Sequence, residues 1–227
     1  MTTQNKLNEF WENRNELEPF IAKRRAWDFD SFARDKRQIG LIYQIKDQSV
    51  IDNLLELNEI LSEFDCYNPF PKEHFHVTLK ILGTISNEKE SPNDYSISNI
   101  DDLLFNLKTK ISWFYKFQAK IKLINLFPSV LFAEVFDNGK FLELNKIICE
   151  TNDIVTFPER DLENYIPHIA LGNFKNNNIK DFVDKVSELR NLDFGMIEVN
   201  SINLVKVDLT APVPEFERLN MIELGDK

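Results

Sequence analysis

Two of the three histidines in this chain of 227 residues open matched tetrapeptides, His76-Val77-Thr78-Leu79 and His168-Ile169-Ala170-Leu171. In both segments apolar and β-branched residues alternate with polar or small ones, which predicts a strand. Side chains two residues apart project from the same face of a strand, so each histidine shares a face with the third residue of its segment. Histidine titrates near neutral pH and acts as a general acid or base. Two such strands facing each other would place an acid and a base around one substrate.

The surroundings of the two segments repeat at one offset. Ile39 lies in a strand-like run 37 residues before His76, and Leu131 lies in a second run 37 residues before His168. An apolar pattern with helical spacing separates the run from the histidine in both cases. Strand, helix and histidine strand therefore occur twice, which indicates an internal duplication. An approximate two-fold axis between the copies would bring the histidine strands face to face across a groove.

The two motifs, separated by roughly half the chain, resemble the His-x-Thr/Ser-apolar signature of the two-histidine (2H) phosphoesterases. This family includes the 2'-5' RNA ligases and RNA 2',3'-cyclic phosphodiesterases of bacteria and archaea. The first tetrapeptide matches in full, and the run Tyr165-Ile166-Pro167 resembles the segment that leads into the second. Ala170 stands where the family has Thr or Ser. The resemblance covers about Gln38 to Leu209 and implies an α+β, two-lobed, duplicated β-α-β fold with a central groove.

By this resemblance His76 and His168 are the catalytic pair, and which is acid and which is base stays open. Opening a 2',3'-cyclic phosphate needs a base for water and an acid for the departing ribose oxygen. Thr78 is the expected phosphate-binding hydroxyl. Tyr165 and Lys80 are candidates to supply the donor that an alanine at position 170 lacks. The alternatives are a packing aromatic for Tyr165 and a lysine at the groove rim for Lys80.

The leading hypothesis is a metal-independent phosphoesterase that acts on a 2',3'-cyclic phosphate or on 2'-5'-linked nucleotide or RNA ends. The alternative is a nucleotide-binding module of the same fold, in which Ala170 marks the loss of catalysis. A third interpretation treats both motifs as chance, and the shared 37-residue spacing argues against it. We expect no cofactor and no metal, because the chain lacks the carboxylate clusters and His/Cys spacings of metal sites.

Composition limits the partners. The net charge of −10 argues against a broad nucleic-acid interface and favours a small nucleotide or a short RNA end. The basic residues between Lys23 and Arg37 are either a solvated helix face or a flap that steers substrate. The sequence lacks a long apolar run and a signal peptide, and its two cysteines have no metal-type spacing. We therefore expect a cytoplasmic protein that does not enter a membrane. Its oligomeric state stays open, with a monomer favoured.

The predicted organisation has three parts. An N-terminal helical extension spans 1–37, a two-lobed domain spans 38–210, and a C-terminal tail at 211–227, with Pro212 and Pro214, is expected to be partly disordered. Trp11 and Trp27 are expected to dock the extension, and Ser49 to cap a helix. The expected strands are 38–46, 75–82, 114–124, 130–136, 166–174 and one or two within 194–209. The expected helices are 3–17, 49–64, 98–107, 140–151 and 179–189, and 83–96 is expected to be a loop.

Overall fold

The computed structural model describes residues 2–19, 37–86, 92, 94–96, 100–209 and 214–226. Its main strands are β1 (Arg37–Gln44), β3 (His76–Ile85), β5 (Phe117–Leu126), β6 (Val130–Phe136), β7 (His168–Phe174), β8 (Asp193–Val199), β9 (Ser201–Asp208) and β10 (Glu215–Glu223). Two short strands, β2 (Tyr67–Pro69) and β4 (Asp94–Tyr95), pair with β7 and β3. The helices are α1 (Thr3–Glu12), α2 (Gln48–Leu61), α3 (Ile100–Ile111), α4 (Lys140–Cys149) and α5 (Lys180–Glu188). This mixture confirms the predicted α+β class.

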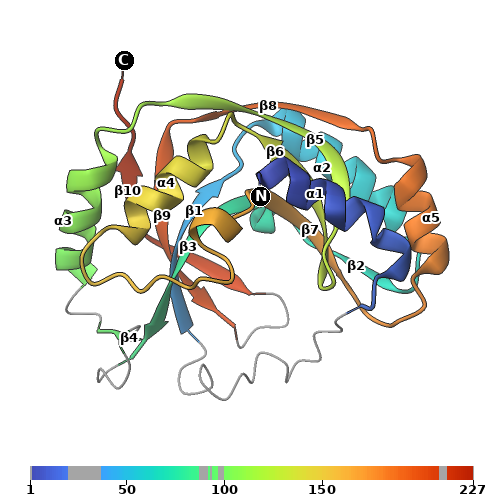
Figure 1. Ribbon diagram of the computed structural model, residues 1–227, viewed down its shortest axis with the longest axis horizontal. Helices are drawn as coiled ribbons and strands as arrows, with labels where there is room; N and C mark the ends of the chain where they lie inside the picture. Colours follow the sequence, from blue (N-terminus) through green and yellow to red (C-terminus); the bar gives the residue numbers. More distant parts are fainter. Residues whose placement is uncertain are drawn as a thin grey trace.

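The strands form one curled sheet in the order β10-β9-β1-β3-β7-β6-β5-β8 (Figure 1). At its middle, β3 and β7 are antiparallel and meet at a single residue pair, Val77 with Ile169. The sheet therefore divides into two lobes, β10-β9-β1-β3 and β7-β6-β5-β8. The two histidine strands are the inner strands of these lobes, so the join between the lobes passes between the histidines.

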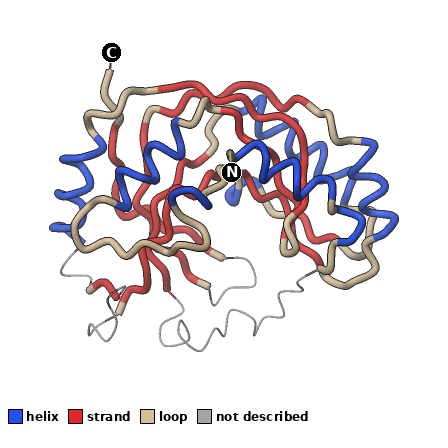
Figure 2. The backbone as a smooth tube through the Cα atoms, viewed as in Figure 1, coloured by secondary structure: helices blue, strands red, loops and turns tan. Residues whose placement is uncertain are grey.

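Two helices cross from one lobe to the other. Helix α2 follows β1 of the first lobe but packs against β7 and β8 of the second. Helix α4 follows β6 of the second lobe but packs against β3 of the first. The traces show α3 and α4 on one side of the molecule and α1, α2 and α5 on the other (Figures 1 and 2). This exchange ties the lobes together, although their strands share only one pair.

The alternation that predicts the histidine strands is visible in their burial. Over the first seven residues, β3 and β7 show the same sequence of buried and half-buried positions. The side chains of Val77, Leu79, Ile169 and Leu171 lie in the core, whereas both histidines are half-buried. Burial of every second apolar side chain fixes the register, because a slip of one residue would turn the apolar set toward the groove.

Helix α2 begins earlier than the expected cap. The N-cap is Asp47, whose Oδ1 accepts the Val50 backbone N–H at 3.1 Å. Ser49 instead donates its hydroxyl to the same carboxylate at 2.7 Å. Both residue types cap helices, and the extended backbone at Asp47 (φ −67°, ψ 115°) decides between them.

The C-terminal segment differs from the expected tail. Residues Glu215 to Glu223 form β10, which pairs along the whole length of β9. Pro214 stands just before this strand, where its missing N–H costs no ladder hydrogen bond. The expected loop also begins later than predicted, since β3 continues to Ile85 and pairs with β4.

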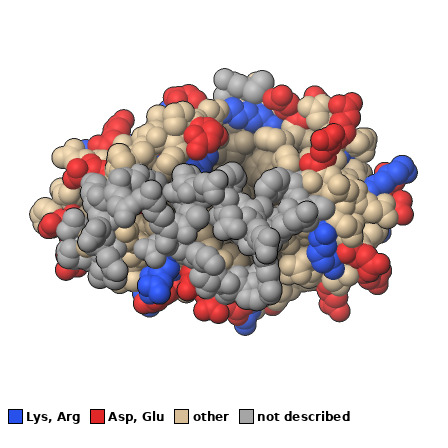
Figure 3. All heavy atoms as spheres, turned by 90° about the horizontal axis from the view of Figure 1, so that it is seen from below, with Lys and Arg blue, Asp and Glu red and all other residues tan. Residues whose placement is uncertain are grey.

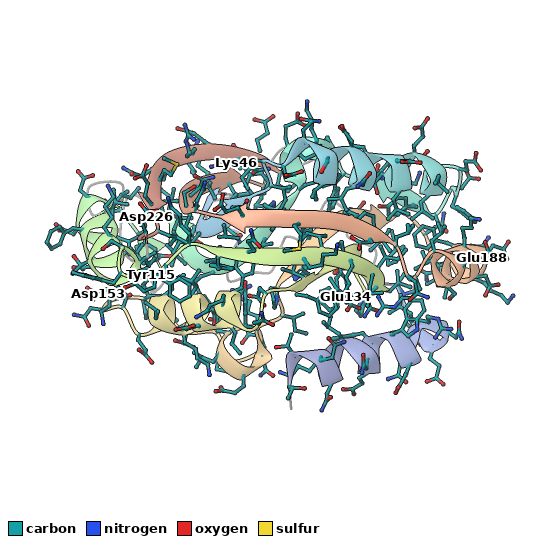
Figure 4. The ribbon with its side chains drawn as sticks, turned by 90° about the horizontal axis from the view of Figure 1, so that it is seen from above. Lys46, Tyr115, Glu134, Asp153, Glu188 and Asp226 are labelled. Atoms are coloured by element: carbon teal, nitrogen blue, oxygen red, sulfur yellow. The ribbon has the colours of Figure 1, made fainter. Side chains whose placement is uncertain are left out.

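The N-terminal helix packs on the second lobe. Leu7 is buried, and its backbone carbonyl accepts Asn125 Nδ2 at 2.8 Å. Trp11 lies against the core, with the guanidinium carbons of Arg14 and Arg190 at 4.3 and 4.5 Å from its ring. Glu134, which pairs with Arg190, lies between β5 and α1 (Figure 4). Trp27, Pro212, the basic residues 23–36 and the first two residues of the expected helix 98–107 lie outside the described residues. No helix in the described ranges has the length and apolar character needed to cross a membrane.

Candidate active site

The crossing of β3 and β7 brings the two histidines together. Continuing the Val77–Ile169 pair by one residue in each direction sets His76 across from Ala170 and Thr78 across from His168. Cross-strand partners share a face of the sheet, and this face is opposite to the buried pair. The two imidazoles therefore lie on one face, diagonally across the join between the lobes. The charge of His168 is one of the causes that lower the pKa of His76.

His76 is held by its own strand and by the C-terminal strand. Its Nε2 lies 3.1 Å from Thr78 Oγ1, and its ring lies 4.8 Å from that of Phe216 in β10. Among the described residues, Nδ1 has no hydrogen-bond partner. Burial lowers the pKa of His76 to about 4. The backbone of His74 opposes this shift, and the charges of His74 and His168 add to it. His76 is therefore a neutral imidazole near pH 7 in the free protein.

His168 is held differently. Its Nδ1 donates to the carbonyl of Ile166 at 2.8 Å, which places the ring proton on Nδ1 and leaves the lone pair on Nε2. Phe127 and Phe132 contact the ring edge-on, at centroid distances of 5.1 and 5.5 Å. Burial lowers the pKa of His168, and the backbone of Ile166 opposes this shift. This imidazole is neutral near pH 7 as well, with a defined tautomer.

Ala170 carries no hydroxyl, and the side chain beside it on the neighbouring strand is aromatic. Its cross-strand partner on β6 is Phe132, which is fully buried and stacks on Phe127 at 4.0 Å. Cross-strand partners lie side by side on one face of a sheet, so an aromatic ring occupies the surroundings of position 170. Both imidazoles contact phenyl rings, but in the first lobe the hydroxyl of Thr78 also lies beside the imidazole on its own strand.

Lys80 is buried and does not lie at a groove rim. Its ammonium forms an ion pair with Asp161 and lies 4.3 Å above the ring of Phe157. Asp161 also accepts the backbone N–H of Phe157 at 2.7 Å. Burial lowers the pKa of Lys80, and Asp161 opposes this shift. The charge of Lys80 is thus matched by a carboxylate from the segment that leads into β7.

Tyr165 makes a second link between that segment and β3. Its side chain is buried, and its hydroxyl donates to the backbone carbonyl of Thr78 at 2.9 Å. Burial raises the pKa of Tyr165 well above its ordinary value, so the phenol stays protonated. Tyr165 and Lys80 therefore both fix the approach to His168 against the strand of His76.

A cavity of about 990 Å³ opens beside these residues, with Thr78, Lys80, Tyr165 and His168 in its wall. Helix α1 supplies the facing wall, which includes Phe10. The described charged residues of the lining are the carboxylates Glu9, Glu16, Glu18, Glu159 and Asp161 and the cations Lys6, Lys80 and Arg160. Seen from below, the surface is hollowed beside the residues drawn in grey, with acidic and basic side chains near the hollow (Figure 3). The described lining is thus more acidic than basic.

Several residues around the histidines have no clear signal in the sequence. Asp161 belongs to a run of polar residues before β7, a pattern typical of a solvated loop, yet it is 3% exposed. Phe216 lies in the expected tail, and Phe127 and Phe132 are indistinguishable from other core phenylalanines. The duplication gives one indication. Because Ala170 is the equivalent of Thr78, it predicts that other residues surround His168 where a hydroxyl would otherwise lie.

Comparison with known proteins agrees with this geometry. The family model of the AKAP7 2'5' RNA ligase-like domain matches residues 41–216. The RNA 2',3'-cyclic phosphodiesterase of Methanocaldococcus jannaschii is 29% identical over 151 residues, which are 64% of this chain and 78% of that protein. A Thermus thermophilus protein of known structure aligns with a TM-score of 0.62 at 19% identity, over 82% of this chain and 97% of that one.

The structure of E. coli LigT complexed with 3'-AMP aligns with a TM-score of 0.58 at 10% identity, over 83% of this chain and 97% of that one. At these identities the two solved structures show a shared fold. The family model, in contrast, spans more than half of the sequence and includes both histidine strands. The chain therefore belongs to the AKAP7 2'5' RNA ligase-like domain family of two-histidine phosphoesterases.

Proposed function

We propose that this protein is a metal-independent phosphoesterase that acts on 2',3'-cyclic phosphates or 2'-5' linkages at the ends of nucleotides or short RNA. One observation supports it above all. The antiparallel crossing at Val77 and Ile169 sets His76 and His168 diagonally on one face of the sheet. Two imidazoles in this arrangement flank a phosphorus atom placed between them.

The proposed reaction needs one proton donor and one proton acceptor. One imidazole takes a proton from water, the water oxygen bonds to phosphorus, and the bond from phosphorus to a ribose oxygen breaks. The second imidazole, protonated, gives its proton to that departing oxygen. A bound phosphate is a nearby negative charge, and it raises the pKa of an imidazole that burial had lowered. Substrate binding thus promotes protonation of the acid.

Thr78 is the proposed contact for the phosphoryl oxygens, because its hydroxyl lies beside His76 and in the cavity wall. We propose an indirect role for Lys80 and Tyr165. The ammonium of Lys80 pairs with Asp161 and the hydroxyl of Tyr165 donates to a backbone carbonyl, so both support the phosphate site from behind.

The proposed substrate is short. Carboxylates outnumber cations among the described residues of the cavity wall, and the whole chain carries a charge of −10. Each further phosphate of a longer RNA would be repelled by this field. A mononucleotide carries the reacting phosphate with the least additional charge, and E. coli LigT of the same fold has been observed with 3'-AMP.

The direct test is turnover of nucleoside 2',3'-cyclic phosphates in the presence of EDTA, with the nucleoside monophosphate product followed by chromatography. Wild type should open the ring, and His76→Ala and His168→Ala should each lower kcat by roughly 10²- to 10⁴-fold. The double variant should lose little more than either single variant, since the two groups act as a unit. The urea-denaturation midpoint of each variant controls for loss of stability. Absence of turnover, or unchanged turnover in His76→Ala, would contradict the proposal.

A nucleotide-binding module is the second candidate function, and Ala170 is the observation that favours it. The second lobe offers phenyl rings where a hydroxyl would assist the transition state. In that case calorimetric titration with a mononucleotide should show saturable binding, while the same protein forms no product.

A further inference from the structure

Because β3 and β7 share a single residue pair, the backbone groups next to that pair lie outside a β3–β7 ladder, and β2 pairs with β7 only from Gly172 onward. Backbone groups two residues apart face the same edge of a strand, so the carbonyls of Leu79 and Leu171 face the diverging join as those of Val77 and Ile169 do. Each of these leucines lies three residues after a histidine. A buried carbonyl without a partner is costly, so a donor has to come from elsewhere.

The crossing helices supply those donors at equivalent positions. Asn145 on α4 donates Nδ2 to the carbonyl of Leu79 at 2.8 Å. Asn58 on α2 donates Nδ2 to the carbonyl of Leu171 at 2.9 Å. Both asparagines are buried, and each comes from a helix that follows a strand of the opposite lobe. Asn145 is thus the donor to the Leu79 carbonyl, whereas the Leu171 carbonyl accepts both Asn58 and the backbone N–H of Phe70, the latter at 2.8 Å.

Both amides are fixed in orientation. The side-chain oxygen of Asn58 accepts the hydroxyl of Tyr67 at 2.7 Å, and that of Asn145 accepts the backbone N–H of Leu162 at 2.8 Å. With donor and acceptor ends both matched, neither amide gains by rotating. The distance from each helix to each histidine strand is therefore set by short, oriented hydrogen bonds within the core.

We propose that Asn58 and Asn145 are positioning residues that set the divergence of β3 from β7 and thereby the separation of the two imidazoles. The catalytic consequence rests on the proposed function. The geometric consequence does not, because it concerns the histidines themselves. Loss of Asn145 removes the donor to the buried Leu79 carbonyl, and the strand relieves this by moving or by admitting water. Loss of Asn58 leaves the Leu171 carbonyl with the backbone N–H of Phe70, so its effect is the smaller of the two.

The experiment titrates the histidines by NMR in Asn145→Ala and Asn58→Ala. The chain has only three histidines, so the imidazole signals are few. The titratable groups that face His76 are His74 on its own segment and His168 on β7. If the gap between β3 and β7 widens or admits water, the imidazole of His76 becomes less buried and the charge of His168 repels its proton less. The pKa of His76 should therefore rise from about 4 toward 6.5 in Asn145→Ala. The pKa of His168 should rise less in Asn58→Ala, because the Leu171 carbonyl keeps the Phe70 N–H. In Asn145→Ala kcat should fall by about 10- to 100-fold with little change in KM, and in Asn58→Ala it should fall by less.

Asn53→Ala is the matched control. Asn53 also lies on α2 and donates Nδ2 to a strand carbonyl, that of Phe194 at 3.1 Å, but this strand is β8. Its loss should leave the histidine titrations and kcat unchanged. If an alanine variant does not fold, the corresponding serine variant, Asn58→Ser or Asn145→Ser, is used instead, because it keeps a small polar side chain.

The two proposals fail in different ways. Unchanged histidine titrations in both asparagine variants would overturn the positioning role, whether or not the protein turns over substrate. Absence of turnover in wild type, together with shifted titrations in the variants, would overturn the proposed function alone.

Discussion

At the scale of single residues, burial governs the protonation of the proposed acid and base. It lowers the pKa of His76 to about 4 and that of His168 below its ordinary 6.5. In the free protein both rings therefore become protonated only on the acidic side of neutrality. Acid–base catalysis needs one ring in each state, so the reactive form is most abundant between the two pKa values.

We therefore predict that kcat/KM for a 2',3'-cyclic nucleotide peaks below pH 6.5 and declines toward pH 8. The same shifts affect folding. The unfolded chain binds protons at His76 and His168 near pH 6.5 and the folded chain only at lower pH, so stability falls as pH drops through this window. Rate profiles and denaturation profiles should be recorded over the same pH range. A maximum above pH 7 would contradict the pKa directions.

Position 170 offers a test of the missing hydroxyl. Threonine and valine have nearly the same shape, so a comparison of Ala170→Thr with Ala170→Val separates the hydroxyl from its packing cost against Phe132. A correctly placed donor is worth roughly 10²-fold in kcat, and we expect Ala170→Thr to exceed Ala170→Val by about tenfold or more. Equal kcat in the two variants would show that a side-chain donor in the second lobe is not limiting.

At the scale of elements, the Lys80–Asp161 pair joins β3 to the segment that precedes β7. Both side chains are almost fully buried. Removing one partner of such a pair leaves a buried charge, so Lys80→Ala should lower the free energy of unfolding by about 3 kcal/mol or more. The double variant Lys80→Met/Asp161→Leu should lose less, because no charge is left unpaired. Urea denaturation measures both.

The exposed pair Lys180–Asp184 on α5 is the control for this comparison, with side chains 85% and 62% exposed. Lys180→Ala should change the free energy of unfolding by less than about 0.5 kcal/mol. An equally small effect for Lys80→Ala would mean that Asp161 finds another partner or a proton.

Elements whose stability depends on local pattern were predicted well. The alternation in β3, β6 and β7 and the helical spacing in α2, α4 and α5 are each confined to one stretch of chain, and the structure confirms them. Strand β10 was not predicted, because its partner β9 provides the hydrogen bonds that make it a strand. The N-cap of α2 is Asp47 and not the predicted Ser49, because the backbone angles decide between two neighbouring residues that can both cap a helix.

At the scale of the whole molecule, the cavity and the net charge together select against long substrates. We predict that kcat/KM is higher for a cyclic mononucleotide than for an oligonucleotide with the same cyclic end. This difference should shrink as salt is raised from about 0.02 M to 0.5 M, because salt screens repulsion. At low salt, kcat/KM for an oligonucleotide with uncharged methylphosphonate linkages should lie closer to that of the mononucleotide than kcat/KM for the charged oligonucleotide does. A preference for the charged oligonucleotide that weakens with salt would instead indicate a basic binding face.

The sequence by itself determined the two histidine strands, their duplication and the face that each imidazole shares with position 78 or 170. The alternation of apolar and polar residues and the repeated spacing are properties of short stretches of chain, so they can be recognised in the sequence alone. The tertiary structure alone decided which groups surround those imidazoles. Lys80 meets Asp161 across 81 positions, and Asn58 meets the carbonyl of Leu171 across 113. Such contacts exist only after the crossing helices have packed, because pairing between distant groups is fixed by the shape of the core and by the cost of leaving buried polar atoms without partners.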